Sequence, residues 1–314
     1  MKKPLIILTG PTAVGKTELS IALAKMVQGS IISADSMQVY RHMDIGSAKI
    51  TEAEMQGITH YLVDILDPEE EFHVVRFQEY AKRAMEQIYQ EGRIPIVVGG
   101  TGFYIQALLY DIDFTEEQDN IKIRKELEQY ARENGAHALH RMLAQADPEA
   151  AASIHENNVK RVVRALEFYR LSGKKISEHN ETQRQRKSPY QYAYFVLNDN
   201  RDLLYERINR RVDRMLKEGL EEEVRRLQEM GFQKDMVSMQ GLGYKEMLDY
   251  LEGSCSLDEA VYRIKRDTRH FAKRQLTWFR RERDVIWIEK GTFQYDAQKI
   301  LSYMRERLIE KNLI

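Results

Sequence analysis

The feature that most constrains this chain is a glycine-rich string near its start. Residues 10–17 read Gly-Pro-Thr-Ala-Val-Gly-Lys-Thr and match the pattern G-x-x-x-x-G-K-[ST] in full. An apolar run at 5–8 precedes the string and an amphipathic run at 18–26 follows it. Such a strand–loop–helix unit binds phosphate, because backbone N–H groups and the helix N-terminus point at the anion. The pattern alone does not distinguish a nucleoside triphosphate from another diphosphate.

The eight residues of this phosphate loop are expected to bind the phosphates together. They are Gly10, Pro11, Thr12, Ala13, Val14, Gly15, Lys16 and Thr17. Lys16 adds a positive charge, and the Thr17 hydroxyl can hold a Mg²⁺ ion that bridges the phosphates. The alternative, a glycine-rich turn without a ligand, fits the strand and helix on either side less well.

Charge and cysteine content exclude several classes of protein. The chain of 314 residues has 48 basic and 49 acidic side chains, so any nucleic-acid surface must be a local patch. The single cysteine excludes an internal disulfide framework and suits a reducing cytoplasm. No apolar stretch approaches 18 residues, so we expect no membrane span.

Strand-like runs alternate with helical patterns in the first part of the chain. Runs at 30–34, 58–65 and 94–98 read as further strands, and 72–89 reads as a helix. This alternation predicts an α/β fold, a P-loop NTPase-like parallel sheet flanked by helices. Ligands gather at the carboxyl ends of such strands, where Asp35 and Thr101 would join the phosphate loop.

Both of these residues have two interpretations. Asp35 could act as a base or a metal-linked carboxylate, or it could cap a helix. Thr101, in a Gly-Gly-Thr-Gly turn, could donate to a phosphate oxygen or cap the next helix.

The pattern changes near residue 114. Helical periodicity dominates 116–187, with helices expected at 119–134, 136–145 and 158–172, and the polar stretch 178–188 is expected to be mobile. We therefore expect a core domain formed by 1–115 and 188–314, with a helical insertion domain at 116–187. The second part of the core is expected to contain strands at 192–197 and 285–288 and helices at 201–217, 220–230, 243–251, 256–282 and 296–310.

Two segments concentrate positive charge. Residues 160–187 contain nine Lys and Arg against three acids, and residues 263–283 contain nine against two. On a helix, Ile264, Phe271 and Trp278 would form a buried stripe, and a cationic stripe would lie opposite. The members of that cationic stripe are Arg266, Arg269, Lys273 and Arg280. It is either a solvated face or a phosphate-backbone contact.

A third group of basic residues lies on the helix expected at 201–217. Arg207, Arg211 and Arg214 share one face, which is either solvated or an arginine clamp on a leaving phosphate. The string 240–245 can be read as a turn before a helix.

Seven ordered strings resemble the tRNA dimethylallyltransferase family, also called tRNA isopentenyltransferases. They lie at 10–17, 35–40, 43–49, 99–104, 161–167, 241–246 and 273–280. The resemblance runs from residue 5 to about 288. It implies transfer of the dimethylallyl group of dimethylallyl diphosphate to N6 of an adenine, with release of diphosphate and a need for Mg²⁺. The adenine would be that at tRNA position 37, beside the anticodon, in tRNAs that read codons beginning with U. A monomer that acts in the cytoplasm is expected.

The resemblance also assigns roles to residues. Asp35 would take the N6 proton, Thr101 would lie near the donor's bridging oxygen, and Lys16 would neutralise leaving-group charge. Arg211 matches a diphosphate-contacting arginine, with Arg207 as the other candidate. The anticodon stem-loop would contact Asp35, Ser36, Met37, Gln38, Thr101, Lys160, Arg161, Val162, Val163, Arg164, Gln240, Gly241, Leu242, Gly243, Tyr244, Lys245, Lys273, Arg274, Gln275, Trp278 and Arg280.

Two departures from the family pattern and two rival functions accompany this interpretation. The family's usual His-Pro-Asn-Asp is His-Glu-Asn-Asn at 155–158, and its usual Gln before Arg161 is Lys160. These departures leave the fine contacts of that helix with the anticodon arm open. A small-molecule kinase or a nucleotide-switched RNA-binding protein would also use the phosphate loop, and both would prefer ATP or GTP to a prenyl diphosphate.

Overall fold

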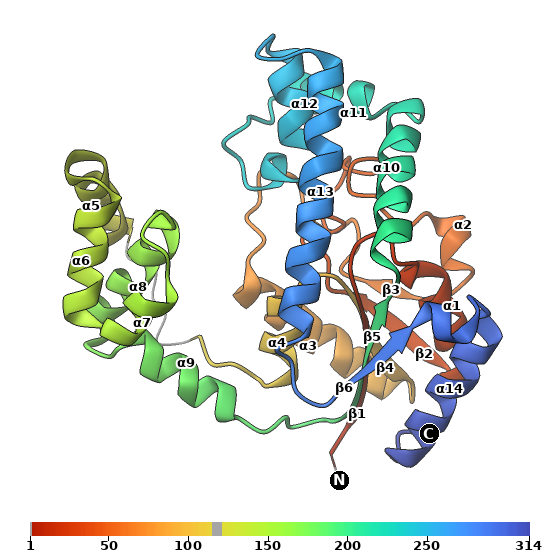
Figure 1. Ribbon diagram of the computed structural model, residues 1–314. Helices are drawn as coiled ribbons and strands as arrows, with labels where there is room; N and C mark the ends of the chain where they lie inside the picture. The colour runs from red at the N-terminus through yellow and green to blue at the C-terminus, as the bar shows by residue number, and fades with distance from the viewer. Residues whose placement is uncertain (1, 115–120) are drawn as a thin grey trace. The chain divides into compact units, whose positions relative to one another are not determined.

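A single parallel sheet forms the centre of the protein. The computed structural model describes residues 2–114 and 121–314. Six parallel strands lie in the order β3-β2-β4-β1-β5-β6 (Figure 1). The strands are β1 (Pro4–Thr9), β2 (Gly29–Ser33), β3 (His60–Tyr61), β4 (Ile94–Gly99), β5 (Gln191–Asn198) and β6 (Val285–Glu289). The predicted α/β class is therefore confirmed.

Both faces of the sheet are covered by helices. Helices α1 (Lys16–Val27) and α14 (Ala297–Glu310) pack on one face, and α3 (Val74–Gln90) and α4 (Gly102–Leu109) belong to the other. Successive side chains of a strand point to opposite faces, so a strand buried on both faces reads as a continuous apolar run. The run at 5–8 in β1 is of this kind, and all four of its side chains are buried.

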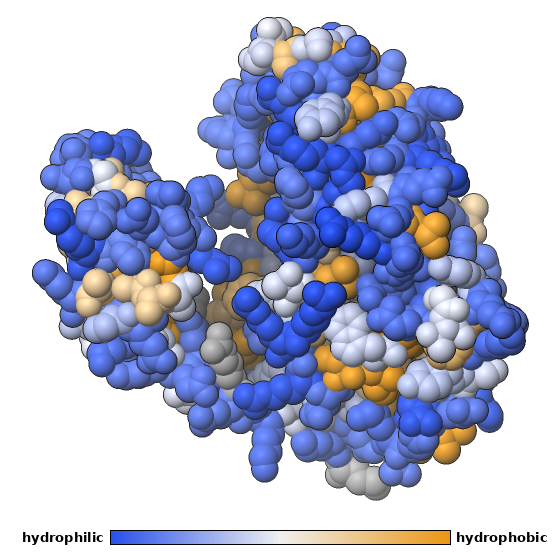
Figure 2. All heavy atoms as spheres, in the orientation of Figure 1, coloured by the Kyte–Doolittle hydropathy of each residue, from blue (hydrophilic) through white to orange (hydrophobic). Residues whose placement is uncertain are grey.

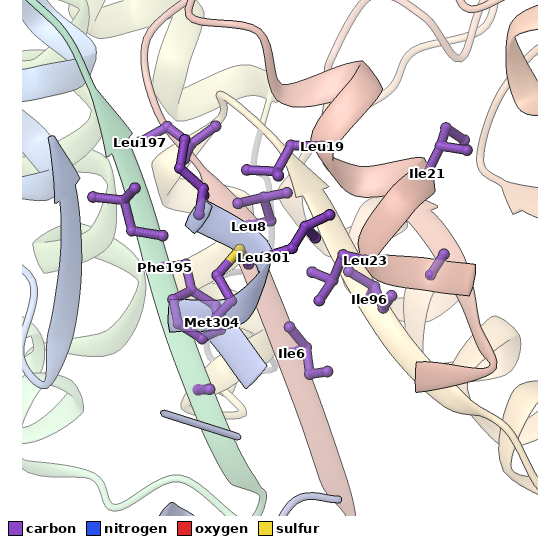
Figure 3. Packing of buried hydrophobic residues seen from close by; sticks show 14 of the residues in the cluster. Ile6, Leu8, Leu19, Ile21, Leu23, Ile96, Phe195, Leu197, Leu301 and Met304 are labelled. Carbon is purple, nitrogen blue, oxygen red and sulfur yellow. The ribbon is translucent and has the colours of Figure 1, made fainter. Parts of the chain in front are cut away.

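The core under α1 and α14 joins residues from distant parts of the chain. Ile6 and Leu8 of β1 pack with Phe195 of β5 and with Leu301 and Met304 of α14 (Figure 3). The parallel register places Ile6 beside Ile96 in β4 and beside Ala193 in β5. The last helix of the chain is thereby attached to the strand that carries the phosphate loop.

Four helices of the second half of the chain pack against one another. They are α10 (Arg201–Lys217), α11 (Leu220–Glu229), α12 (Tyr244–Leu251) and α13 (Leu257–Phe279). Side chains of α10, α11 and α13 form hydrogen bonds with the turns that follow β1, β2 and β4. These helices therefore cover the carboxyl edge of the sheet, where ligands of such folds bind.

Residues 110–188 form a separate compact unit, and residues 1–109 and 189–314 form the other. The described helices of the unit 110–188 are α5 (Ile121–Asn134), α6 (Ala136–Ala146), α7 (Pro148–Ser153), α8 (Val159–Ser172) and α9 (Ile176–Gln185). Leu127, Leu139, Leu143 and Leu166 form the centre of its own hydrophobic core. In the described part of the chain, no helix is long and apolar enough to cross a membrane.

Two expectations for the elements were wrong in detail. The third strand has only two residues, because Leu62 and Asp64 adopt left-handed φ angles of 64° and 60° and end it. The second difference lies in the buried face of α13 and concerns the site. The polar stretch 178–188 begins within α9, and Ser177 near the start of this helix donates to the buried Asp147 carboxylate.

A matched pair on α10 tests the packing of this helix. Leu204 is 1% exposed, whereas its neighbour Leu203 is 40% exposed. Leu204→Ala should lower the free energy of unfolding by about 2–5 kcal/mol, because it leaves a cavity in the core. Leu203→Ala should change it by about 0.5 kcal/mol or less. Urea unfolding measures both, and equal losses would contradict this placement of α10.

Candidate active site

The turns that follow β1, β2 and β4 meet at one edge of the sheet. These three strands are neighbours, so their carboxyl ends lie together. At Gly99 the end of β4 approaches Ala34 so closely that an added Cβ would lie 2.2 Å from the Ala34 carbonyl oxygen. The Thr101 N–H donates to that same oxygen at 3.2 Å. The structure thus brings Thr101 next to the residue that precedes Asp35, as the sequence predicted.

Lys16 lies inside the phosphate loop. Its Nζ donates to the carbonyl oxygens of Gly10 and Pro11, at 3.0 and 2.9 Å. Burial lowers the pKa of Lys16 from 10.5 to about 8. Asp35 opposes this shift and Arg211 adds to it, so both groups lie close enough to act on the ammonium. A bound anion would raise this pKa again, since it favours the charged form.

The structure distinguishes the two candidate arginines. Arg211 donates to the Thr12 hydroxyl of the phosphate loop at 3.3 Å, and burial lowers its pKa. Arg207 instead forms an ion pair with the buried Asp199. Arg211 is therefore the arginine that reaches the loop, and Arg207 is held to one side of it.

Asp35 begins a turn and not a helix, so the helix-cap interpretation is wrong. Its Oδ1 accepts hydrogen bonds from the N–H groups of Met37 and Gln38, at 2.9 and 3.4 Å. Within residues 2–114 and 121–314, its Oδ2 accepts no hydrogen bond. One carboxylate oxygen thus fixes the side chain, and the other is free to receive a proton.

Gln275 holds two of these turns together. Its Oε1 accepts from the Thr12 N–H at 2.8 Å, and its Nε2 donates to the Gly100 carbonyl at 3.0 Å. The side chain is 6% exposed. Both ends of its amide form hydrogen bonds within the protein, so Gln275 supports the phosphate loop.

Other members of the predicted tRNA-contacting set also have buried side chains. Val162 and Val163 lie in the core of the helical unit. Tyr244 is fully buried, and its hydroxyl is hydrogen-bonded within the protein. These side chains pack in the interior and support the surface residues above them. The spacing of residues in the sequence could not reveal this burial.

Lys290 is a residue of the site that the sequence analysis missed. Its Nζ donates to the Val14 carbonyl oxygen at 3.1 Å, and a Cβ added at Gly15 would lie 3.0 Å from it. Burial lowers the pKa of Lys290, and the nearby Arg207 lowers it further. Lys290 follows β6 and lies 276 residues beyond Val14 in the chain. Only the position of β6 in the sheet could therefore have indicated that Lys290 belongs to the site.

The donor set for a metal ion is small. No group of three or more His, Cys, Asp and Glu side chains that could hold a metal ion occurs among the residues described here. The exposed Thr17 at the start of α1 supplies one hydroxyl. This set fits Mg²⁺, which keeps several waters and binds through one or two protein groups plus substrate phosphates.

The cationic stripe of α13 divides into paired and unpaired members. Arg266 pairs with Asp267, and Arg269 donates to Asn209. The stripe members Lys273 and Arg280 are exposed, as is Arg274 beside the stripe, and within the described ranges none of the three forms an ion pair. The visible face of α13 is accordingly hydrophilic in Figure 2. These last three residues fit the phosphate-contact interpretation better than the solvated one.

The buried stripe of α13 differs from the predicted one. Its buried members are Ala260, Ile264, Ala272, Gln275 and Phe279. Phe271 and Trp278 are only partly buried. The prediction failed because a hydrophobic pattern excludes glutamine, and here the hydrogen-bonded Gln275 occupies a core position.

On α8, two of the predicted contacts are exposed. Lys160 and Arg161 lie near the start of the helix with exposed side chains. Arg164 instead forms an ion pair with the buried Glu167 at 3.1 Å. Lys160 and Arg161 therefore belong to the basic surface of this unit, whereas Arg164 neutralises a buried carboxylate.

Known proteins of one family resemble this chain. The family model described as IPP transferase matches residues 38–282. A tRNA dimethylallyltransferase of Lachnoclostridium phytofermentans is 62% identical over 312 residues, 99% of each chain. The crystal structure of a tRNA isopentenylpyrophosphate transferase from Bacillus halodurans has a TM-score of 0.74 at 44% identity, covering 99% of this chain and 98% of that one. A eukaryotic dimethylallyltransferase acting on tRNA has a TM-score of 0.77 at 32% identity, covering 91% of this chain and 74% of that one. The chain belongs to the IPP transferase family.

Proposed function

We propose that this protein transfers the dimethylallyl group of dimethylallyl diphosphate to N6 of an adenine in tRNA. One observation carries the proposal. The phosphate loop, the desolvated cations of Lys16 and Arg211, and the Asp35 carboxylate lie together at one edge of the sheet. A diphosphate leaving group needs the first two, and an amine nucleophile needs the third. The names of the similar proteins support the same reaction.

The reaction breaks one bond and forms another. The N6 lone pair forms a bond to C1 of the dimethylallyl group, and the C1–O bond breaks with its electron pair leaving on diphosphate. The surplus proton on N6 goes to the free Oδ2 of Asp35. Proton transfer to a positioned carboxylate contributes about 10²–10⁴-fold to a rate.

Lys16 and Arg211 would stabilise the charge that develops on the leaving diphosphate. Both are already desolvated and oriented by the loop, so little reorganisation is needed as the bond breaks. Thr101 would donate to the bridging oxygen from the turn after β4. Thr17 would hold Mg²⁺ through its hydroxyl, and the ion would supply positive charge to offset that of the phosphates.

The acceptor would reach this edge by leaving its base stack, as base-modifying enzymes require. Ser36, Met37 and Gln38 would meet the flipped base. By analogy with the family, the base is the adenine at position 37 of tRNAs that read codons beginning with U. The exposed cations of α13 and α8 would bind the anticodon stem-loop, and residues 110–188 would thus form a tRNA-contacting insertion. We place the reaction in the cytoplasm and expect a monomer.

One reaction tests the proposal. Purified protein, Mg²⁺ and dimethylallyl diphosphate are mixed with an unmodified tRNA whose anticodon loop carries consecutive adenines, and the nucleosides are analysed by mass. We expect N6-dimethylallyl adenosine with the wild-type protein and none with Lys16→Ala. Asp35→Ala should lower turnover by about 10²–10⁴-fold while tRNA affinity changes little.

The same assay separates the rivals. Transfer or hydrolysis of the ATP γ-phosphate, with no modified adenosine, would mean that the protein is a kinase or a nucleotide switch. An equal loss of tRNA affinity and turnover in Asp35→Ala would contradict the role of Asp35 as the base.

The exposed cations of α13 are predicted to bind tRNA phosphates, which the salt dependence of binding tests. Lys273→Ala and Arg274→Ala should each weaken tRNA binding and reduce its log–log salt slope by about one for each phosphate that is no longer neutralised. Arg305→Ala removes an exposed charge on α14 and is the control. Binding is measured between about 50 and 200 mM salt, the range over which phosphate neutralisation changes affinity strongly. An unchanged slope would mean that this face of α13 is only solvated.

A further inference from the structure

A buried carboxylate lies outside the site described so far. Glu223 of α11 is 2% exposed. Its Oε2 accepts from the N–H groups of Asp44 and Ile45, both at 2.8 Å. Its Oε1 accepts from the Gly46 N–H at 3.0 Å. A single side chain therefore binds three successive N–H groups of a loop nearly 180 residues earlier in the chain.

Tyr244 completes this arrangement. Its hydroxyl donates to Glu223 Oε1 at 2.8 Å and accepts from the Ser47 N–H at 3.1 Å. A Cβ added at Gly46 would lie 2.5 Å from Cζ of the tyrosine ring, so only glycine fits there. Burial and the adjacent carboxylate raise the pKa of Tyr244 well above its ordinary value of 10.0, which keeps the hydroxyl protonated as a donor.

The turn held in this way is connected to the residues beside Asp35. The Gln38 amide donates to the Ala48 carbonyl oxygen at 3.0 Å. Lys49 Nζ donates to the Tyr40 carbonyl oxygen at 2.6 Å. The Met37 side chain packs against Gly241, where an added Cβ would lie 2.4 Å from its methyl carbon. Residues 37–49 thus form one hydrogen-bonded loop that rests on α11 and on the turn before α12.

We propose that Glu223 and Tyr244 are positioning residues that hold the loop 37–49 in the shape that receives the flipped base. The inference rests on the proposed function, since it assigns the loop to the acceptor. Within residues 2–114 and 121–314, neither side chain forms a hydrogen bond with the phosphate loop, so we assign their role to tRNA and not to the prenyl donor.

The chemistry of the contact explains why a carboxylate is used. Both of its oxygens face N–H or O–H donors, and a carboxylate only accepts. Glutamine has nearly the same shape, but its NH₂ group must face at least one of these donors. Glu223→Gln therefore separates the hydrogen bonding from the volume of the side chain.

The test compares Glu223→Gln and Tyr244→Phe with Glu222→Gln, which makes the same charge change at an exposed neighbour on α11. KM for tRNA and for dimethylallyl diphosphate is measured separately, together with Tm. For Glu223→Gln we expect KM for tRNA to rise about tenfold or more, with KM for the donor within about twofold of wild type, because an unsatisfied buried donor distorts the loop. Tyr244→Phe should raise KM for tRNA less, since the three N–H groups keep their acceptor. Glu222→Gln should behave as wild type.

Two results would overturn the inference. A lower Tm in Glu223→Gln with an unchanged KM for tRNA would leave the residue a purely structural role. An equal rise in both KM values would mean that it acts on the whole edge of the sheet.

Hydrogen exchange keeps this test independent of the proposed function. A wild-type protein that forms no modified adenosine would refute that function. In that case the amides of Asp44, Ile45 and Gly46 should still lose protection in Glu223→Gln and keep it in Glu222→Gln. Unchanged protection of these amides in Glu223→Gln would show that Glu223 does not fix the conformation of the loop.

Discussion

The structure depends on holding positive charges out of water beside the phosphate loop. The pKa of Lys16 falls from 10.5 to about 8, which corresponds to about 3 kcal/mol against its charged form. Lys290 and Arg211 are shifted in the same direction by burial. A bound anion would offset this cost, because its negative charge favours the charged forms of all three cations. A diphosphate supplies such a charge, and so would a diphosphate that forms during a reaction.

The remaining parts of the core keep these charges in place. Gln275 attaches the phosphate loop to the turn after β4, and Lys290 supports it from the end of β6. Asp199 neutralises Arg207 and keeps it to one side. Glu223 performs a comparable function for the loop after β2. Gln275, Lys290 and Glu223 are thus side chains from the second half of the chain that fix the backbone of the first half. The phosphate site and the loop beside Asp35 are therefore two separately supported parts of one edge.

The sequence predicted most of what is local and little of what is distant. The phosphate loop, the strands of the sheet and the bounds of α10 follow from spacing and apolar periodicity, which act within a few residues. Lys290 and Glu223 have no such signal, because their partners lie 276 and nearly 180 residues away and are backbone groups. The family resemblance assigned Gln275 to tRNA contact, and the structure shows that its amide satisfies two backbone groups of distant turns. The choice between Arg207 and Arg211 also required the structure, since both lie on one face of α10 and only Asp199 separates their roles.

We propose that this edge of the sheet binds a prenyl diphosphate in preference to a nucleoside triphosphate. Equilibrium competition between dimethylallyl diphosphate and ATP, in the presence of Mg²⁺, measures it most directly. We expect the prenyl diphosphate to displace bound ATP at lower concentration than ATP displaces the prenyl diphosphate, by about tenfold or more, a difference of about 1.4 kcal/mol. Tighter binding of ATP would contradict the account, because the cations around Lys16 would then serve a triphosphate.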